Sequence, residues 1–119
     1  MGNSAFAELD FSLSSIRSTR EKLRPYVRET PIWVWRGVDV DRLFGLGTEL
    51  VFKFEQLQVA GTFKPRGAFS ALLALDDVAR RRGIIAVSAG NHAIAVAHAK
   101  VSAISFSTFR FVSFFSNVD

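Results

Sequence analysis

The feature that most restricts the fold of this chain is a short, continuously apolar run, Ile84–Val87, between two segments with helical patterns. Gly83 precedes the run, and an alanine-rich segment over 93–103 follows it. Four apolar residues in succession are typical of a parallel strand with helices on both faces, because alternation is expected only where one face meets water. A strand between two helices therefore predicts an α/β fold.

Periodicity extends this alternation of elements toward the amino terminus. Apolar residues at helical spacing predict helices, and the alternation over 50–55 predicts a strand with one face buried more deeply. Proline marks helix boundaries, because it fits the first turn of a helix but not its interior. The predicted elements that join the strand over 84–87 are a helix that begins near Leu13 and ends at Pro25, an extended segment over 32–35, a strand over 50–55, a helix from Pro65 to Gly83 with the stripe Ala68, Leu72, Leu75 and Ala79, and a last helix over 93–103.

Composition and charge exclude several classes of protein. The 119 residues include no Cys, which excludes disulfide scaffolds, thiolate nucleophiles and Cys-ligated metal sites. The net charge of +4 arises between residues 61 and 100, where three Arg before Gly83 are better explained as a helix end than as a nucleic-acid contact. The apolar stretches 84–99 and 101–116 are short for a membrane span. With no targeting signal at residues 1–6, we expect a cytoplasmic protein without nucleic-acid or membrane partners.

The first segment that carries chemistry is Gly61–Ala68, which places one lysine, Lys64, at a predicted turn between strand and helix. A residue before proline avoids the helical region, so we expect Lys64 to be extended, with its side chain free to reach a cleft. A lysine amine can form a Schiff base with a carbonyl compound. The alternative interpretation is a surface lysine near the start of a helix.

The second such segment, Ser88–His92, follows the apolar run directly. Gly90 permits a tight turn, and the free N–H groups of the next helix form a site for a carboxylate or phosphate. Asn91 and Ser88 add side-chain hydrogen-bonding groups. An ordinary helix cap is the alternative. His92 and His98 are too few ligands for a metal site, so no metal is expected.

These two segments, preceded by Lys53, Glu55 and Gln58 in the pattern K-x-E-x-x-Q, resemble the amino-terminal part of the threonine/serine dehydratases. These are pyridoxal-phosphate enzymes of fold type II, and the resemblance covers about residues 12–100. It implies that Lys64 forms the Schiff base with pyridoxal phosphate and shuttles the α-proton of the substrate. The resemblance implies further that Phe63 packs near the cofactor ring and that Asn91 hydrogen-bonds its phenolic oxygen.

The resemblance also implies a substrate site and a reaction. The loop that would hold the carboxylate of an amino-acid substrate consists of Ser88, Ala89, Gly90, Asn91 and His92. The implied reaction is the deamination of L-threonine or L-serine to a 2-oxo acid and ammonia. Serine racemases of this superfamily have a serine acid/base at the position of Ala89, and alanine cannot transfer a proton. The resemblance therefore favours dehydration over racemisation.

The resemblance ends near Lys100, where the composition changes. Ser and Phe supply ten of the 19 residues over 101–119, and no glycine follows Gly90, so the glycine-rich phosphate loop of the family has no counterpart. We expect residues 1–100 to be the amino-terminal part of a catalytic domain, with an incomplete fold-type II architecture of partial parallel sheet and flanking helices. Residues 101–119 are expected to be an atypical tail.

Three hypotheses about the function of such a chain remain open. The first is an amino-terminal fragment of a dehydratase with low or no activity. The second is a non-catalytic module that associates with a full-length dehydratase subunit. The third is a small enzyme that self-association completes.

Overall fold

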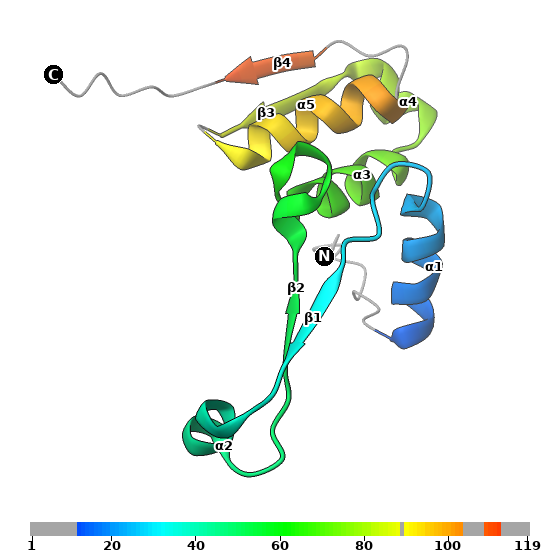
Figure 1. Cartoon of the computed structure of the whole chain (residues 1–119). Helices are drawn as coiled ribbons and strands as arrows, with labels where there is room; N and C mark the ends of the chain where they lie inside the picture. The colour runs from blue at the N-terminus through cyan, green and yellow to red at the C-terminus, as the bar shows by residue number, and fades with distance from the viewer. Residues whose placement is uncertain (1–11, 89, 104–108, 113–119) are drawn as a thin grey trace, which may run out of the picture.

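The computed structural model describes residues 12–88, 90–103 and 109–112, and it alternates helices and strands. Figure 1 shows a helical body and an arm that projects from it, with α2 at the tip of the arm. The elements are α1 (Leu13–Leu23), β1 (Ile32–Trp35), α2 (Val38–Phe44), β2 (Leu50–Lys53), the short 3-10 turns η1 (Glu55–Leu57) and η2 (Val59–Gly61), α3 (Lys64–Leu73), α4 (Asp77–Arg82), β3 (Ile84–Val87), α5 (Asn91–Ala103) and β4 (Phe109–Val112). The predicted α/β class is confirmed.

The body is built around Phe69 of α3, whose side chain is fully buried. Its ring stacks on Tyr26, with 4.9 Å between ring centroids, and meets His98 of α5 in a T-shaped contact at 5.8 Å. Helix α5 packs along α3 with Ala95 and Ala99 fully buried, and such small side chains allow two helices to approach closely. The core cluster consists of Leu23, Ala68, Phe69, Leu72, Ala86, Ala95, Val96 and Ala99.

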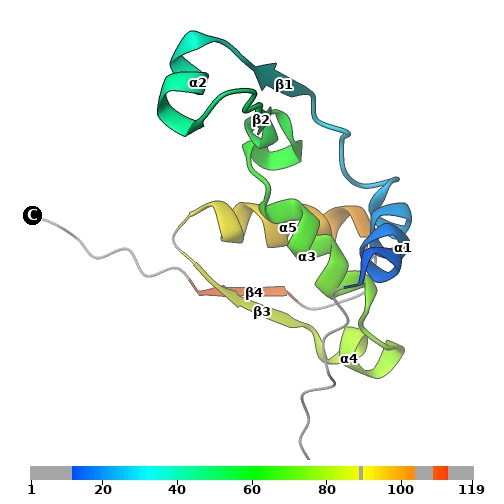
Figure 2. The same ribbon diagram turned by 90° about the horizontal axis from the view of Figure 1, so that it is seen from below.

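Strands β3 and β4 form a parallel pair, with Ile84 opposite Phe109 and Val87 opposite Val112. Figure 2 shows α5 on one side of this pair. Ala86 is buried in the core, whereas Ile85 and Val87 are exposed. The predicted parallel pairing is therefore present, but the expectation that helices cover both faces of β3 is wrong for the part of the chain that the structure describes. One face of β3 meets the core, and the opposite face meets solvent.

The helix predicted from Pro65 to Gly83 is two helices in the structure. Helix α3 ends at Leu73, and the carboxylate of Asp76 accepts a hydrogen bond from the Ala79 N–H (2.7 Å), which starts α4. An aspartate cap of this kind satisfies a free N–H at a helix start, so it favours a new helix over a continued one. The longest described helix, α5, has 13 residues, and no helix among the described residues could cross a membrane.

The arm consists of β1, α2 and β2, and its two strands pair antiparallel. Trp33, Trp35 and Phe52 form a cluster of rings with centroids 5.9 to 6.3 Å apart, and all three side chains are substantially exposed. The apolar side chains Ile32 and Val51 are exposed as well. The alternation over 50–55 therefore identified a strand, but the deeply buried face that it predicted is absent from β2. Helix α2 had no counterpart among the predicted elements.

Candidate functional site

Lys64 is the first residue of α3 and follows a tight turn. Ala60, in the turn η2, has a left-handed backbone (φ 61°), and the Arg66 N–H donates to the Phe63 carbonyl (3.1 Å). The expected extended backbone at Lys64 is not observed, because Pro65 fits the first helical turn and the helix includes the residue before it. The Lys64 side chain is half-buried, and its ammonium has no hydrogen-bond or ion-pair partner among the described residues.

The segment Ser88–His92 connects β3 to α5, as the sequence predicts. Helix α5 starts at Asn91, and the Gly90 carbonyl accepts a hydrogen bond from the Ala93 N–H (2.9 Å). The Ser88 hydroxyl oxygen accepts from the Gly90 N–H (3.2 Å), which closes a local turn. Asn91 and His92 are exposed, whereas Ala89 lies outside the described residues. Asn91 and His92 are therefore accessible to solvent at the start of α5, whereas the next residue, Ala93, is buried.

The structure brings the two predicted segments to the starts of helices that pack together. Helix α5 lies against α3 and also contacts η2 (Val59–Gly61), the turn that leads to Phe63 and Lys64. Among the described residues, no hydrogen bond or ion pair joins Lys64 to the segment Ser88–His92. Lys64 and the described residues of this segment are therefore not committed to a polar contact with each other.

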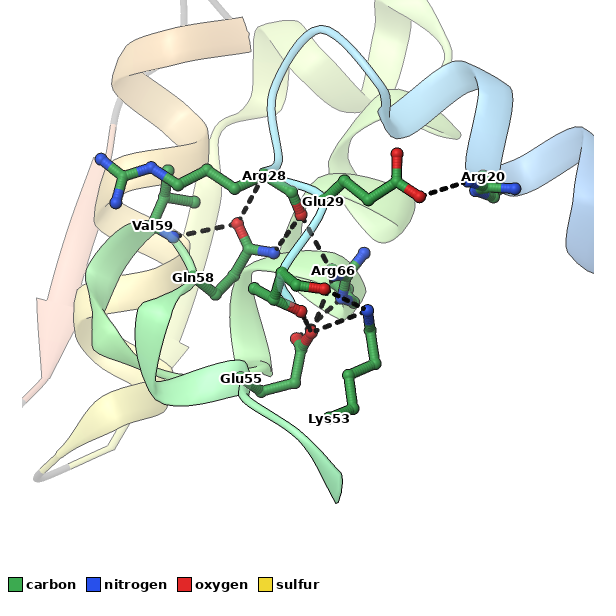
Figure 3. Close-up of polar contacts among 9 residues, drawn as sticks. Arg20, Arg28, Glu29, Lys53, Glu55, Gln58, Val59 and Arg66 are labelled. Carbon is green, nitrogen blue, oxygen red and sulfur yellow. Dashed lines mark hydrogen bonds and ion pairs between the residues drawn. The ribbon is translucent and has the colours of Figure 1, made fainter. Parts of the chain in front are cut away.

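A polar cluster of five interacting groups lies close to Lys64 among the described residues, and the sequence patterns did not predict it. The guanidinium of Arg66 donates from Nε to Oε2 of Glu55 and from Nη2 to Oε1 of Glu55, both at 2.8 Å (Figure 3). The Thr30 hydroxyl also donates to Oε1 of Glu55 (2.5 Å). The Lys53 ammonium donates to the Thr30 carbonyl (3.1 Å) and lies 3.9 Å from Oε1 of Glu55. This cluster joins β2, η1, α3 and the segment before β1.

The hydrogen bonds from Arg66 are the main reason that the pKa of Glu55 is lowered from 4.5 to about 2. Partial burial acts in the opposite direction, while the Thr30 hydrogen bond and the charges of Arg66 and Lys53 lower the pKa further. The same hydrogen bonds, which Arg66 donates to Glu55, raise the pKa of Arg66. Glu55 and Arg66 are therefore a charged pair across the whole physiological pH range.

Gln58 also binds the segment before β1, through the backbone of Arg28. Its Oε1 accepts from the N–H of Arg28 (2.7 Å) and of Val59 (2.9 Å), and its Nε2 donates to the Arg28 carbonyl (2.8 Å) (Figure 3). The Gln58 side chain is almost fully buried, so these bonds satisfy its amide. The K-x-E-x-x-Q pattern thus forms the contacts that attach the strand β2 and the turn after it to the rest of the body.

A cavity of about 890 Å³ opens beside this cluster, between α1 and the segment before β1. Lys53, Glu55 and Arg66 line it, together with residues of α1. Of the predicted site residues that the structure describes, only Phe63 reaches it. The cavity and the site predicted from the sequence are therefore adjacent places that meet at Phe63.

The family to which the chain belongs follows from comparison with known proteins. Residues 23–100, more than half of the chain, match the family model described as "Pyridoxal-phosphate dependent enzyme", and this region contains both segments and the polar cluster. The chain belongs to this family. Pyridoxal-phosphate-dependent enzymes of this family share the cofactor that the resemblance implied, so that expectation is confirmed at the level of the family.

Curated pyridoxal-phosphate-dependent relatives match the same region. The chain is 52% identical over 87 residues to a phenylserine dehydratase of Ralstonia pickettii, which covers 73% of this chain and 26% of the relative. It is 41% identical over 85 residues to a serine racemase of Oryza sativa subsp. indica, which covers 71% of this chain and 24% of the relative. The chain thus spans about a quarter of the length of the relatives that it matches.

Solved structures of fold-type II enzymes share the architecture. A maize serine racemase superposes with a TM-score of 0.65 and 37% identity, covering 85% of this chain and 30% of the racemase. A T.th. threonine deaminase superposes with a TM-score of 0.63 and 38% identity, covering 85% of this chain and 33% of the deaminase. The predicted fold-type II relationship is confirmed.

Proposed function

We propose that this chain carries the lysine-bearing part of a pyridoxal-phosphate-dependent lyase that removes ammonia from β-hydroxy amino acids such as L-threonine and L-serine. The observation that carries this proposal is the placement of Lys64 and Asn91 at the first turns of α3 and α5, two helices that pack together. The names of several relatives refer to 3-hydroxy amino acids: phenylserine, serine, threonine and threo-3-hydroxyaspartate.

The chemistry of the described residues suits this cofactor. The amine of the half-buried residue Lys64 can form a Schiff base with the aldehyde of pyridoxal phosphate, and the amide of the exposed residue Asn91 can donate to a ring oxygen. Bound pyridoxal phosphate withdraws electrons from the α-carbon of an amino acid and makes the α-proton acidic. The sequence has no glycine after Gly90, so these residues supply the ring end of the site rather than a backbone cradle for the phosphate.

In this proposal the residues of the chain have separate tasks. The Lys64 amine accepts the α-proton at Nζ once it is free of the cofactor. The N–H groups at the start of α5, with the side chains of Ser88 and Asn91, bind the substrate carboxylate. Phe63, which is exposed and lines the cavity, covers the edge of the ring. Ala89 has no proton to transfer, which favours loss of the β-hydroxyl over racemisation.

Trapping the cofactor on the protein tests this proposal. The chain is incubated with pyridoxal phosphate, reduced with borohydride and digested, and the modified lysine is identified by mass spectrometry. We expect the adduct at Lys64, with none at this position in Lys64→Ala and no change at Lys64 in the control Lys22→Ala, which alters an exposed lysine of α1. Equal labelling of all four lysines of the sequence would overturn the proposal.

A second candidate function is association with a longer dehydratase chain, and the arm favours it. Trp33 and Trp35 are 52% and 38% exposed, and Ile32 and Val51, elsewhere on the same strand pair, are about 60% exposed. An isolated two-stranded ribbon is marginally stable, and exposed apolar patches mark interaction surfaces. The relatives have about four times the residues of the matched region, so a chain of their length has the elements to cover such an arm.

The arm provides its own probe, because Trp33 and Trp35 are the two tryptophans of the sequence. The chain is labelled with fluorotryptophan and mixed with the T.th. threonine deaminase, and fluorine NMR reports the environment of the arm. We expect both resonances to shift and the two proteins to co-elute, with Trp33→Ser weakening the association and the control Leu13→Ser, on exposed α1, leaving it unchanged. Unshifted resonances with separate elution would refute this function.

A further inference from the structure

We propose that the ion pair between Glu55 and Arg66 is a positioning device for Lys64. The pair fixes the rotation of the first turn of α3 and thereby the direction in which the Lys64 side chain leaves the helix. This inference deepens the proposed function and rests on it for the identity of the ligand. It concerns two side chains that have no role in the function as proposed above.

The geometry of the pair restrains rotation as well as distance. Arg66 uses two different nitrogens, Nε and Nη2, for the two carboxylate oxygens of Glu55, each at 2.8 Å. A planar guanidinium held at two points has one orientation relative to the carboxylate, whereas a single contact would leave it free to turn. Nη2 of Arg66 also donates to the Arg28 carbonyl (3.2 Å), which adds a third point of attachment.

Helix geometry transmits this restraint to Lys64. Lys64 and Arg66 are both in the first turn of α3, two residues apart. Successive residues of an α-helix turn by roughly 100°, so two side chains at this spacing point to roughly opposite sides. With Arg66 directed toward Glu55, Lys64 is directed away from it. A rotation of the turn that released Arg66 would swing the lysine amine by the same angle.

The Glu55–Arg66 pair is itself held in place by its surroundings. Only 19% of the Glu55 side chain and 32% of the Arg66 side chain are exposed, and Thr30 and Lys53 hold the same carboxylate. The Arg28 carbonyl accepts hydrogen bonds from both Arg66 and Gln58, so two side chains hold the segment before β1 in place. By contrast, the pair Arg20–Glu29 has a similar separation of 3.0 Å, but both of its side chains are mostly exposed.

The test compares Glu55→Gln and Arg66→Lys with the control Glu29→Gln in the full chain. Arg66→Lys keeps the charge but loses the two-point contact, so it separates geometry from electrostatics. Three readouts are taken: the ratio of pyridoxal-phosphate adduct at Lys64 to that at Lys22, the ratio of acetylation at the same two lysines without cofactor, and hydrogen exchange over α3 and α5. The second and third readouts do not depend on cofactor binding.

We expect the adduct ratio to fall roughly tenfold in both pair variants, because small displacements of a reacting group have large effects on rate. Hydrogen exchange should accelerate over the first turn of α3 while α5 stays protected, and Glu29→Gln should behave like the wild type. Unchanged adduct and acetylation ratios in a variant with protected α5 would overturn the inference.

Two further outcomes remain decisive. If α5 loses its protection from hydrogen exchange in Glu55→Gln, that variant has lost its fold, and Arg66→Lys becomes the deciding variant. Wild-type ratios of adduct and of acetylation at Lys64 to Lys22 in Arg66→Lys would then refute positioning. If the wild type shows no preference for Lys64 with pyridoxal phosphate, the proposed function fails, while the acetylation ratio of Lys64 to Lys22 still tests whether the pair directs the amine. A shift of that ratio supports positioning, and its constancy refutes it.

Discussion

Acidification provides a quantitative test of the Glu55–Arg66 pair through the stability of the fold. The pKa of Glu55 is about 2 in the folded chain against the ordinary 4.5, so the unfolded chain binds more protons between these values. The stabilisation is therefore fully present above about pH 4.5 and is lost as the pH falls through about 2. In Glu55→Gln this contribution is absent at every pH.

The expected magnitude follows from the shift. A lowering from 4.5 to about 2 corresponds to about 3.4 kcal/mol of free energy of unfolding. The Arg66 side chain is 32% exposed, and water screens part of the attraction, so we expect about 2 kcal/mol. The wild type should thus exceed Glu55→Gln in stability by about 2 kcal/mol at neutral pH, and most of this difference should vanish by about pH 2.5.

Urea unfolding followed by far-UV circular dichroism at a series of pH values measures the difference directly. The other carboxylates titrate in both proteins, so their contributions to the free energy of unfolding cancel in the difference. The remaining pH dependence is that of Glu55. Glu29→Gln is the matched control, because Glu29 forms an ion pair with Arg20 in which both side chains are mostly exposed. A stability difference between wild type and Glu55→Gln that stays constant from about pH 6 to about pH 2.5 would refute the reasoning.

Two further predictions concern the body. Phe69→Ala should lower the free energy of unfolding by about 3 to 5 kcal/mol, because the fully buried ring leaves a cavity, whereas Phe44→Ala on the exposed arm should have little effect. Asp76→Ala should cost about 1 kcal/mol through loss of the α4 cap, and its exposed neighbour Asp77→Ala should cost less. Urea denaturation of each pair of variants checks both, and equal effects within a pair would contradict them.

The position of the polar cluster relates the two proposals to each other. Glu55 and Arg66 line the cavity beside the first turn of α3, and helix geometry directs Lys64 of the same turn away from Arg66. The first turn of α3 therefore links the Glu55–Arg66 ion pair to the amine of Lys64. A substitution in the cluster is expected to act on Lys64 through this turn, without contacting a ligand.

Much of the candidate site was predictable, because local rules control where helices start. Pro65 at a first turn and Gly90 before an alanine-rich segment predicted helices that begin close to Lys64 and Asn91. Helices α3 and α5 begin at these two residues, although Lys64 was expected to be extended. The break after Leu73 was also encoded locally, in the capping side chain of Asp76, but the apolar stripe suggested one continuous helix. Periodicity reports which residues can share a face, and it does not report whether the helix continues.

Local patterns were enough to predict the α/β class, helices that begin close to Lys64 and Asn91, and the family motifs, since each depends on residues close together in the chain. The pairing of Arg66 with Glu55, eleven positions away, and of Gln58 with Arg28, thirty positions away, became visible only in the folded chain. The tertiary structure also decided that the arm and one face of β3 are exposed. Contacts between distant residues depend on how whole elements pack, and no local pattern contains that information.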